Sequence, residues 1–122
     1  MNKLILIFTF IACLLPVGDI VETNATWYGG KLHGRKTASG ERFDQNATTC
    51  AHRTYKFGTY LKVTNLKNGK SVVVKVNDRG PYAKGKGIDL SLGAAKAIDM
   101  VKSGTARVRI EVVNPDSIQF KK

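Results

Sequence analysis

The chain has 122 residues, with 20 Lys and Arg against 9 Asp and Glu and a formal net charge of +11. This length provides one domain with one modest core and excludes a two-domain protein. The positive charge favours an anionic partner, such as nucleic acid, acidic lipid or an acidic wall polymer. The two cysteines, Cys13 and Cys50, exclude a disulfide framework, so the core alone must hold the fold.

The N-terminal segment 1–25 predicts export. A short positive start precedes residues 4–15, which are almost wholly apolar, and small residues around Ala25 allow cleavage after it. This arrangement is typical of a secretory signal peptide, and the apolar run is too short for a typical transmembrane helix. A second interpretation stays open, because residues 10–13 resemble a bacterial lipoprotein processing site that ends at a lipidated Cys13.

Both interpretations place the protein outside the cytoplasm. We expect it in the periplasm, in the outer membrane as a lipoprotein anchored through Cys13, or in the extracellular space. An exported protein does not meet nucleic acid, so the basic surface is predicted to face the cell wall or simply the solvent.

The first half of the mature chain predicts one short strand and a long loop. Residues 25–28 favour a strand that ends at the pair Gly29-Gly30. Residues 31–47 are polar and show no periodicity, which predicts an ordered surface loop, and loops of this length are usually functional. Residues 49–55 predict a helical turn that carries His52.

A hairpin is predicted in the middle of the chain. An alternating run over residues 59–65 and the β-branched run over residues 72–76 flank Asn68-Gly69, a strong hairpin signal. The second run alternates too little to be half exposed, so we expect it to cross the core. Gly80-Pro81 ends this strand and leaves Asp78 at its mouth, since proline has no N–H for a ladder.

The last third predicts one helix between two extended segments. Residues 88–90 read as a short strand, and Ser91 is a good N-cap for a helix over residues 92–100. Residues 105–113 alternate, with Val108 and Ile110 among the inward side chains. These elements fit a small β-barrel of mixed topology, because closure removes the sheet edges that the sequence does little to protect.

Three groups are candidates for joint chemistry: Glu41, His52 and Asp78. Paired carboxylates suit the cleavage of glycosidic bonds, where one group protonates the leaving oxygen and the other stabilises charge or takes a proton. Burial of one acid raises its pKa and divides these roles. Aromatic side chains offer flat faces to sugar rings, although core packing is the commoner role for each of them. The aromatic candidates are Trp27, Tyr28, Phe43, Tyr55 and Tyr82.

Other chemistries have little support in the sequence. The two histidines, His33 and His52, lack the spacing of metal ligands, so we expect neither a metal nor a cofactor. There is no Gly-x-Ser-x-Gly motif and no phosphate-binding loop. Cys50 lies among small residues and is expected to be a buried, inert thiol.

A set of short motifs occurs in one order along residues 25–113, and together they resemble the rare lipoprotein A family. The motifs are Ala25-Thr26-Trp27-Tyr28-Gly29, Thr37-Ala38-Ser39-Gly40-Glu41, Ala51-His52-Arg53-Thr54, Phe57-Gly58-Thr59, Val63-Thr64-Asn65, Val76-Asn77-Asp78-Arg79-Gly80-Pro81-Tyr82, Ile88-Asp89-Leu90-Ser91 and Ala94-Ala95. The resemblance implies a mainly-β fold, a six-stranded double-psi β-barrel related to expansins with one or two short helices. The barrel is expected over residues 26–114, followed by a polar tail over residues 115–122.

The resemblance also implies a function. Enzymes of this family are lytic transglycosylases that act on peptidoglycan strands lacking stem peptides and leave 1,6-anhydro ends. It implies catalytic roles for Asp78, Glu41 and His52. In this interpretation Asp78 is the general acid, Asp78 or Glu41 then takes the proton of the muramic 6-hydroxyl, and His52 orients Glu41 or tunes its charge. We expect a monomer whose side chains meet the glycan, and the predicted substrate contacts are Trp27, Tyr28, Phe43, Arg79 and Tyr82. Two alternatives stay open: a non-catalytic, expansin-like wall-binding module, and a secreted interaction domain whose charge binds anionic polymers.

Overall fold

The computed structural model describes residues 20–114. The predicted apolar leader with Cys13 and the predicted polar tail lie outside the described residues. Within them, no helix is both long and apolar enough to cross a membrane.

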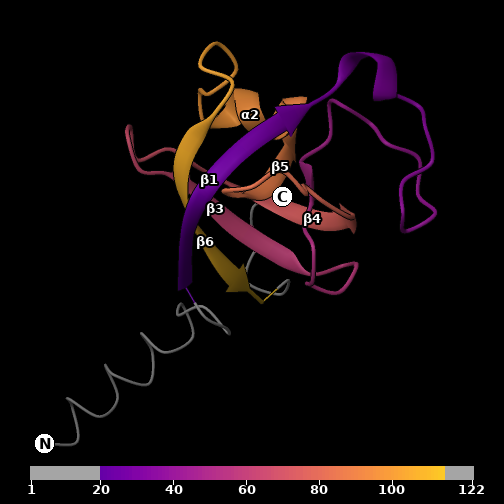
Figure 1. The fold of residues 1–122 in the computed structure, drawn as a ribbon, viewed down its shortest axis with the longest axis horizontal. Coiled ribbons are helices and arrows are strands. Elements are labelled where there is room, and N and C mark those ends of the chain that lie inside the picture. Colours follow the sequence, from indigo (N-terminus) through magenta and orange to yellow (C-terminus); the bar gives the residue numbers. More distant parts are fainter. Residues whose placement is uncertain (1–19, 115–122) are drawn as a thin grey trace, which may run out of the picture.

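Six strands close into a barrel in the order β1-β5-β2-β4-β3-β6 (Figure 1). The strands are β1 Ile20–Tyr28, β2 Thr49–Ala51, β3 Tyr60–Asn65, β4 Ser71–Asp78, β5 Lys86–Ser91 and β6 Ala106–Val113. A 3-10 turn, η1 Gly30–Leu32, follows β1, and the helix α2 Leu92–Ala97 follows β5. The pairs β1–β5 and β2–β4 are parallel, and the other pairs are antiparallel. The predicted mainly-β, six-stranded barrel is confirmed.

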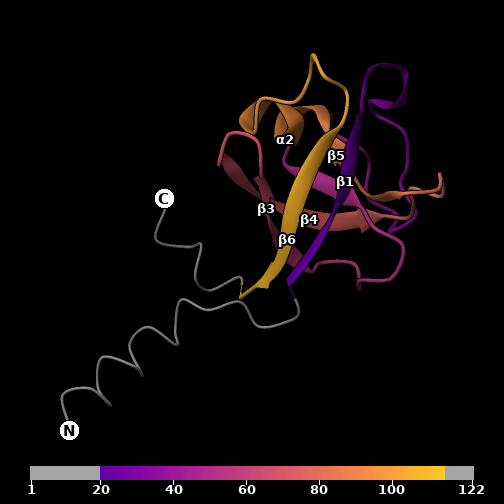
Figure 2. The same cartoon turned by 60° about the vertical axis from the view of Figure 1, so that its left-hand side comes forward.

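The barrel interior holds one apolar core. Alternation along each strand sends every second side chain inward, so Leu61, Val74, Ile88 and Val108 are fully buried. The helix α2 covers one end of the barrel (Figure 2) and adds Ala94 and Ala95 to the core.

The predicted hairpin and the predicted helix cap are both present. The strands β3 and β4 pair antiparallel, and Gly69 in their turn has a φ of 77°, which glycine adopts without steric cost. Ser91 Oγ accepts a hydrogen bond from Ala94 N at 3.3 Å. The helix is shorter than the predicted 92–100, because Asp99 has a φ of 58° and leaves the helical conformation.

The predicted helical turn over residues 49–55 is wrong at its start. Thr49–Ala51 forms β2, which pairs with β4 on one side and β5 on the other. A segment of three residues is too short to express a strand period, and its burial between two neighbours decides its conformation. The bend that follows carries His52.

The strand β1 begins earlier than the sequence predicts. Ile20 to Ala25 pair antiparallel with β6, in register from Glu111 to Ala106, and Ala25 is fully buried (Figure 2). The described barrel therefore starts at Ile20, whereas the predicted domain boundary was residue 26. Cleavage after Ala25 would remove most of a barrel strand.

A chain that starts at Thr26 is expected to be less stable than one that starts at Ile20. The shorter chain loses the pairing of Ile20 to Ala25 with β6 and the buried Ala25 side chain. We expect its thermal unfolding midpoint to fall by about 10 °C or more, measured by circular dichroism. Equal midpoints would show that this half of β1 contributes nothing to the domain.

Candidate active site

A register shift between β2 and β4 turns Asp78 to the outer side of the barrel. Cys50 pairs with Val76, but the next residue, Ala51, pairs with Asp78, so Asn77 is the extra residue of β4. Without this shift Asp78 would follow the inward Val76, and such irregularities often re-aim a side chain beside an active site. Ala51 also pairs with Asp89 of β5.

The result is a row of side chains across four neighbouring strands. In order, the row is Thr26 on β1, Asp89 on β5, Ala51 on β2 and Asp78 on β4. Residues opposite each other in a sheet share a face, so the two carboxylates lie on the same outer side. Between them lies Ala51, whose small side chain is only 3% exposed. We call these four residues the carboxylate row.

Asp78 is fixed by three donors. Its Oδ1 accepts hydrogen bonds from Ala38 N at 3.0 Å and Arg79 N at 2.9 Å. Its Oδ2 lies 3.5 Å from the hydroxyl of Tyr28, which donates to it. Ala38 belongs to the loop 31–47, which extends beside the end of β4 (Figure 1). A predicted functional loop and a predicted catalytic acid are thus brought into direct contact.

Asp89 is a candidate that sequence reasoning missed. It is partly buried, and Thr26 Oγ1 donates a hydrogen bond to its Oδ1 at 2.8 Å. Burial raises the pKa of Asp89, and the charge of Asp78 raises it further, while the Thr26 hydrogen bond opposes the shift. An acid between the apolar residues Ile88 and Leu90 was the available signal, because it must point away from the core.

Tyr28 supports Asp78 as a neutral donor. Burial raises the pKa of the Tyr28 hydroxyl, and the nearby charges of Asp78 and Asp89 raise it further. Its ring stacks on Phe43, with centroids 4.5 Å apart and an interplanar angle of 15°. Phe43 is only 2% exposed. Phe43 therefore supports the Tyr28 ring by stacking from the loop 31–47, and does not offer the free face to a sugar that the sequence suggested.

Phe43→Ala is expected to lower the free energy of unfolding by about 3 kcal/mol, because it removes a buried aromatic ring. The matched control is Tyr82→Ala, since Tyr82 is 76% exposed, and its effect should stay within about 0.5 kcal/mol. Urea denaturation measures both variants. Similar midpoints for the two variants would contradict the supporting role of Phe43.

Glu41 is an ionised carboxylate paired with Lys75. Lys75 Nζ lies 2.8 Å from Glu41 Oε2, and hydrogen bonds from Lys75 and then Asn77 lower the pKa of Glu41. The pairing with Lys75 favours the ionised form of Glu41, which suits a source of negative charge better than a proton donor. The same loop is tied to β4 by Ser39 N, which donates to Asn77 O at 3.3 Å.

A hollow of about 270 Å³ opens beside the pair of Glu41 and Lys75. Its lining includes Ser39 and the ring of Phe57, which is 41% exposed. The lining thus combines polar groups with an exposed aromatic ring, a combination that suits a sugar ligand.

His52 lies beside Asp78 in the backbone, with His52 N donating to Asp78 O at 3.1 Å. Its Nδ1 accepts hydrogen bonds from Thr54 N and Tyr55 N, both at 3.2 Å, and its ring stacks on Tyr55. Burial lowers the pKa of His52, and the charges of Arg53 and Arg79 lower it further. The lowered pKa favours the neutral imidazole at neutral pH. The hydrogen bonds of the His52 side chain stabilise the bend after β2. The side chain that pairs with Glu41 is Lys75, not His52 as predicted.

Of the other predicted substrate contacts, Trp27 and Arg79 make contacts within the protein, and Tyr82 is exposed. Trp27 Nε1 donates to Val101 O at 3.2 Å, and its ring packs against the core. Arg79 donates to the carbonyls of His52 and Tyr55 and lies 3.9 Å from the ring centroid of Phe57. Of the predicted aromatic contacts, Tyr82 is the exposed one.

The structure also bears on thiol and metal chemistry. Cys50 is fully buried, and burial raises the pKa of its thiol, which agrees with the predicted inert role. Among residues 20–114, no group of three His, Cys, Asp or Glu side chains is placed to hold a metal ion.

Residues 20–110 match a family model described as "Lytic transglycolase". The chain belongs to this family. The Campylobacter jejuni protein named "Endolytic peptidoglycan transglycosylase RlpA" is 51% identical over 105 residues, which cover 86% of this chain and 38% of that protein. The Synechocystis protein named "Probable endolytic peptidoglycan transglycosylase RlpA" is 61% identical over 89 residues, which cover 73% and 28% of the two chains. The resemblance to rare lipoprotein A is confirmed, and the chain spans less than half the length of these curated relatives.

Two solved structures support the barrel assignment of this family member. The Streptomyces papain inhibitor has a TM-score of 0.65 and 21% identity, over 82% of this chain and 99% of that one. The apo expansin of Clavibacter michiganensis has a TM-score of 0.63 and 23% identity, over 80% and 52%. These likenesses establish the fold alone, and nothing about activity.

Proposed function

We propose that the chain is a lytic transglycosylase that cleaves peptidoglycan glycan strands and leaves 1,6-anhydro-muramic ends, with a preference for peptide-free strands. The observation that carries this proposal is the carboxylate row, which places two acids of different environment on the same outer side of the barrel, with one strand between them. The names of the relatives support the same activity.

The burial of Asp89 favours it as the general acid. Its raised pKa lets it carry a proton closer to neutral pH, whereas the family resemblance implied this role for Asp78. Asp78, which is aligned by Ala38 N, Arg79 N and the Tyr28 hydroxyl, is then the base. Two acids whose environments differ in this way divide the roles of proton donor and proton acceptor.

In this reaction every bond and proton is accounted for without water as a reactant. Asp89 gives a proton to the oxygen between N-acetylmuramic acid and N-acetylglucosamine, and the bond from that oxygen to the muramic anomeric carbon breaks. The 6-hydroxyl oxygen of the same muramic residue bonds to that carbon, and Asp78 takes the hydroxyl proton. Proton exchange with solvent restores the two carboxyl groups. The ionised Glu41 adds negative charge near a sugar ring that becomes positive in the transition state.

Export remains part of this proposal. Peptidoglycan lies outside the cytoplasm, and segment 1–25 has the pattern of a signal. Because β1 begins at Ile20, lipidation at Cys13 would leave the barrel whole, whereas cleavage after Ala25 would not. This comparison favours the lipid-anchored form. We further propose that the enzyme acts as a monomer and without a cofactor.

The test is to incubate the protein with peptide-stripped glycan strands and to identify the released fragments by mass spectrometry. Anhydro-muramic ends are expected. Reducing ends would make the protein a hydrolase that uses the same acids. Co-sedimentation with the strands but no fragments would refute the proposed activity and favour an expansin-like binding module.

A further inference from the structure

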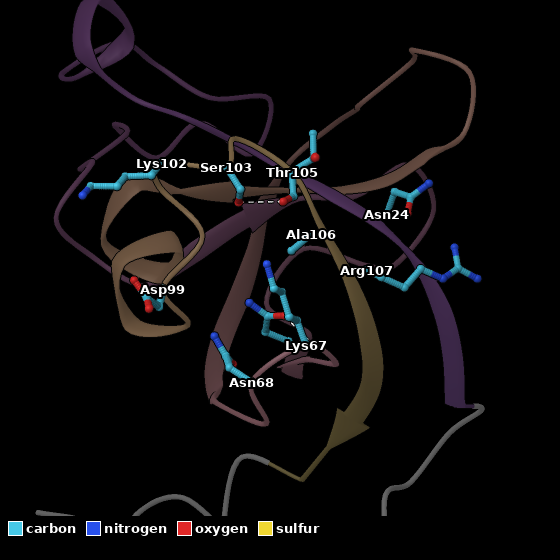
Figure 3. A pocket seen from close by; sticks show the side chains of 10 residues that line it. Asn24, Lys67, Asn68, Asp99, Lys102, Ser103, Thr105, Ala106 and Arg107 are labelled. Atoms are coloured by element: carbon cyan, nitrogen blue, oxygen red, sulfur yellow. Dashed lines mark hydrogen bonds between the residues drawn. The ribbon is translucent and has the colours of Figure 1, made fainter.

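A second and larger concave region lies apart from the carboxylate row. It is a pocket of about 650 Å³, formed where the β3–β4 hairpin and the connection from α2 to β6 meet β1 (Figure 3). Its volume falls in the range of sites that hold small ligands or short stretches of polymer. Nothing in the proposed reaction uses it.

The pocket carries a surplus of positive charge. Lys67, Lys102 and Arg107 all line it, and among residues 20–114 none of the three forms an ion pair. Figure 3 shows Lys67 in the middle of the view, with the charged ends of Lys102 and Arg107 pointing away from it on opposite sides. The acid of the lining, Asp99, lies 3.9 Å from Lys70 Nζ and is already partly neutralised. Three cations around one hollow favour an anionic ligand.

The walls of the pocket are held in place by buried hydrogen bonds. Asn65 Nδ2 and Asn68 Nδ2 both donate to Ile98 O, at 2.9 and 3.1 Å. These bonds join the β3–β4 hairpin to the end of α2, so two walls of the pocket have a fixed separation. A preformed site loses less entropy when it binds a ligand.

The pocket and the carboxylate row share one side of β1. Side chains alternate along β1, so Asn24, Thr26 and Tyr28 point to the outer side of the barrel. Ala25, between Asn24 and Thr26, points inward and is fully buried. Asn24 lines the pocket, Thr26 belongs to the row, and Tyr28 donates to Asp78. Four residues of extended chain span roughly 13 Å, so one polymer strand can reach both places.

We propose that this pocket is a second binding site for an acidic glycan, whose carboxylates pair with Lys67, Lys102 and Arg107 while the same strand continues to the carboxylate row. This inference rests on the proposed function, because peptide-free substrate strands carry a free lactyl carboxylate on each muramic residue. The site would hold the strand during cleavage and would favour long strands over short fragments.

The test measures binding without cleavage. In an Asp78→Asn background, a triple variant with Lys67→Ala, Lys102→Ala and Arg107→Ala is compared with a control triple, Lys31→Ala, Lys62→Ala and Lys84→Ala. Both triples lose the same charge from exposed positions. We expect the pocket triple to bind peptide-free strands about tenfold more weakly in co-sedimentation, and the control triple to bind about as well as the parent. Strands whose carboxylates have been reduced to alcohols should bind the parent as weakly as intact strands bind the pocket triple.

Equal losses in the two triples would mean that net charge alone attracts the strand, and would overturn the proposal. Unchanged binding by the pocket triple, or full binding of carboxyl-reduced strands to the parent, would also overturn it. Failure of the proposed activity is a separate result, because it appears as an absence of fragments from the unmodified protein and leaves the binding measurement intact. In the active background, the pocket triple should cleave a fragment too short to reach the pocket at the parent rate.

Discussion

Asp78→Asn is expected to reduce the release of anhydro-muramic fragments by about 10³-fold, because a carboxamide cannot take the proton of the 6-hydroxyl. The fold should persist, since asparagine has the same shape and its Oδ1 still accepts from Ala38 N and Arg79 N. Fragment release is followed by chromatography and mass spectrometry, and circular dichroism checks the fold.

The matched control for this variant is Asp44→Asn. Asp44 is an exposed acid of the same loop that contacts Asp78, but it lies outside the carboxylate row. It should retain nearly full activity. A folded Asp78→Asn protein with the activity of the Asp44→Asn protein would remove Asp78 from the mechanism.

Asp89→Asn is expected to lower activity by about 10²-fold or more, because it removes the proton donor for the leaving oxygen. The same substitution should stabilise the protein at neutral pH. The pKa of Asp89 is raised in the folded state, so its contribution to stability is full below the unfolded carboxyl pKa of about 3.9 and is lost as the pH rises through the folded pKa. Asparagine avoids that loss and keeps the Thr26 hydrogen bond.

Thermal unfolding between pH 3 and pH 7 measures this second effect. The midpoint of Asp89→Asn should match the parent at the acidic end and exceed it at the neutral end. Asp44→Asn should show no such growing difference, because Asp44 is exposed. If Asp89→Asn did not raise the unfolding midpoint at neutral pH, the result would contradict the proposed cost of burying the charged Asp89. If Asp89→Asn kept full activity, Asp89 would be excluded as the general acid.

The sequence predicted the parts of the barrel that carry their own periodicity. The strands β3, β4 and β6 alternate or run through the core, and Ser91 caps α2 as expected. The strand β2 was missed because three residues cannot display a period, and its strand character comes from β4 and β5 on either side. The first half of β1 was assigned to the leader, since its partner β6 is more than eighty residues away in the sequence.

In the candidate site, too, the residues with a local sequence signal were predicted and those that depend on non-local pairing were missed. Asp78 was predicted because it ends a conspicuous strand, and Glu41 because it lies in a long polar loop. Asp89 was missed because only the pairing of β2 with both β4 and β5 brings it level with Asp78. The stacking of Phe43 on Tyr28 depends on how the loop 31–47 folds back, which no local pattern encodes. These features depend on contacts between residues far apart in the sequence, which local patterns do not reveal.

In the proposed mechanism the 6-hydroxyl of the muramic residue, and not water, attacks the anomeric carbon. The direct measurement is cleavage of peptide-free strands in water enriched in oxygen-18, followed by mass spectrometry of the new muramic ends. The carboxylate row with Asp89 as acid and Asp78 as base predicts anhydro ends that contain no oxygen-18. Muramic ends that carry oxygen-18 at the anomeric carbon would contradict the mechanism and show that the two acids activate water.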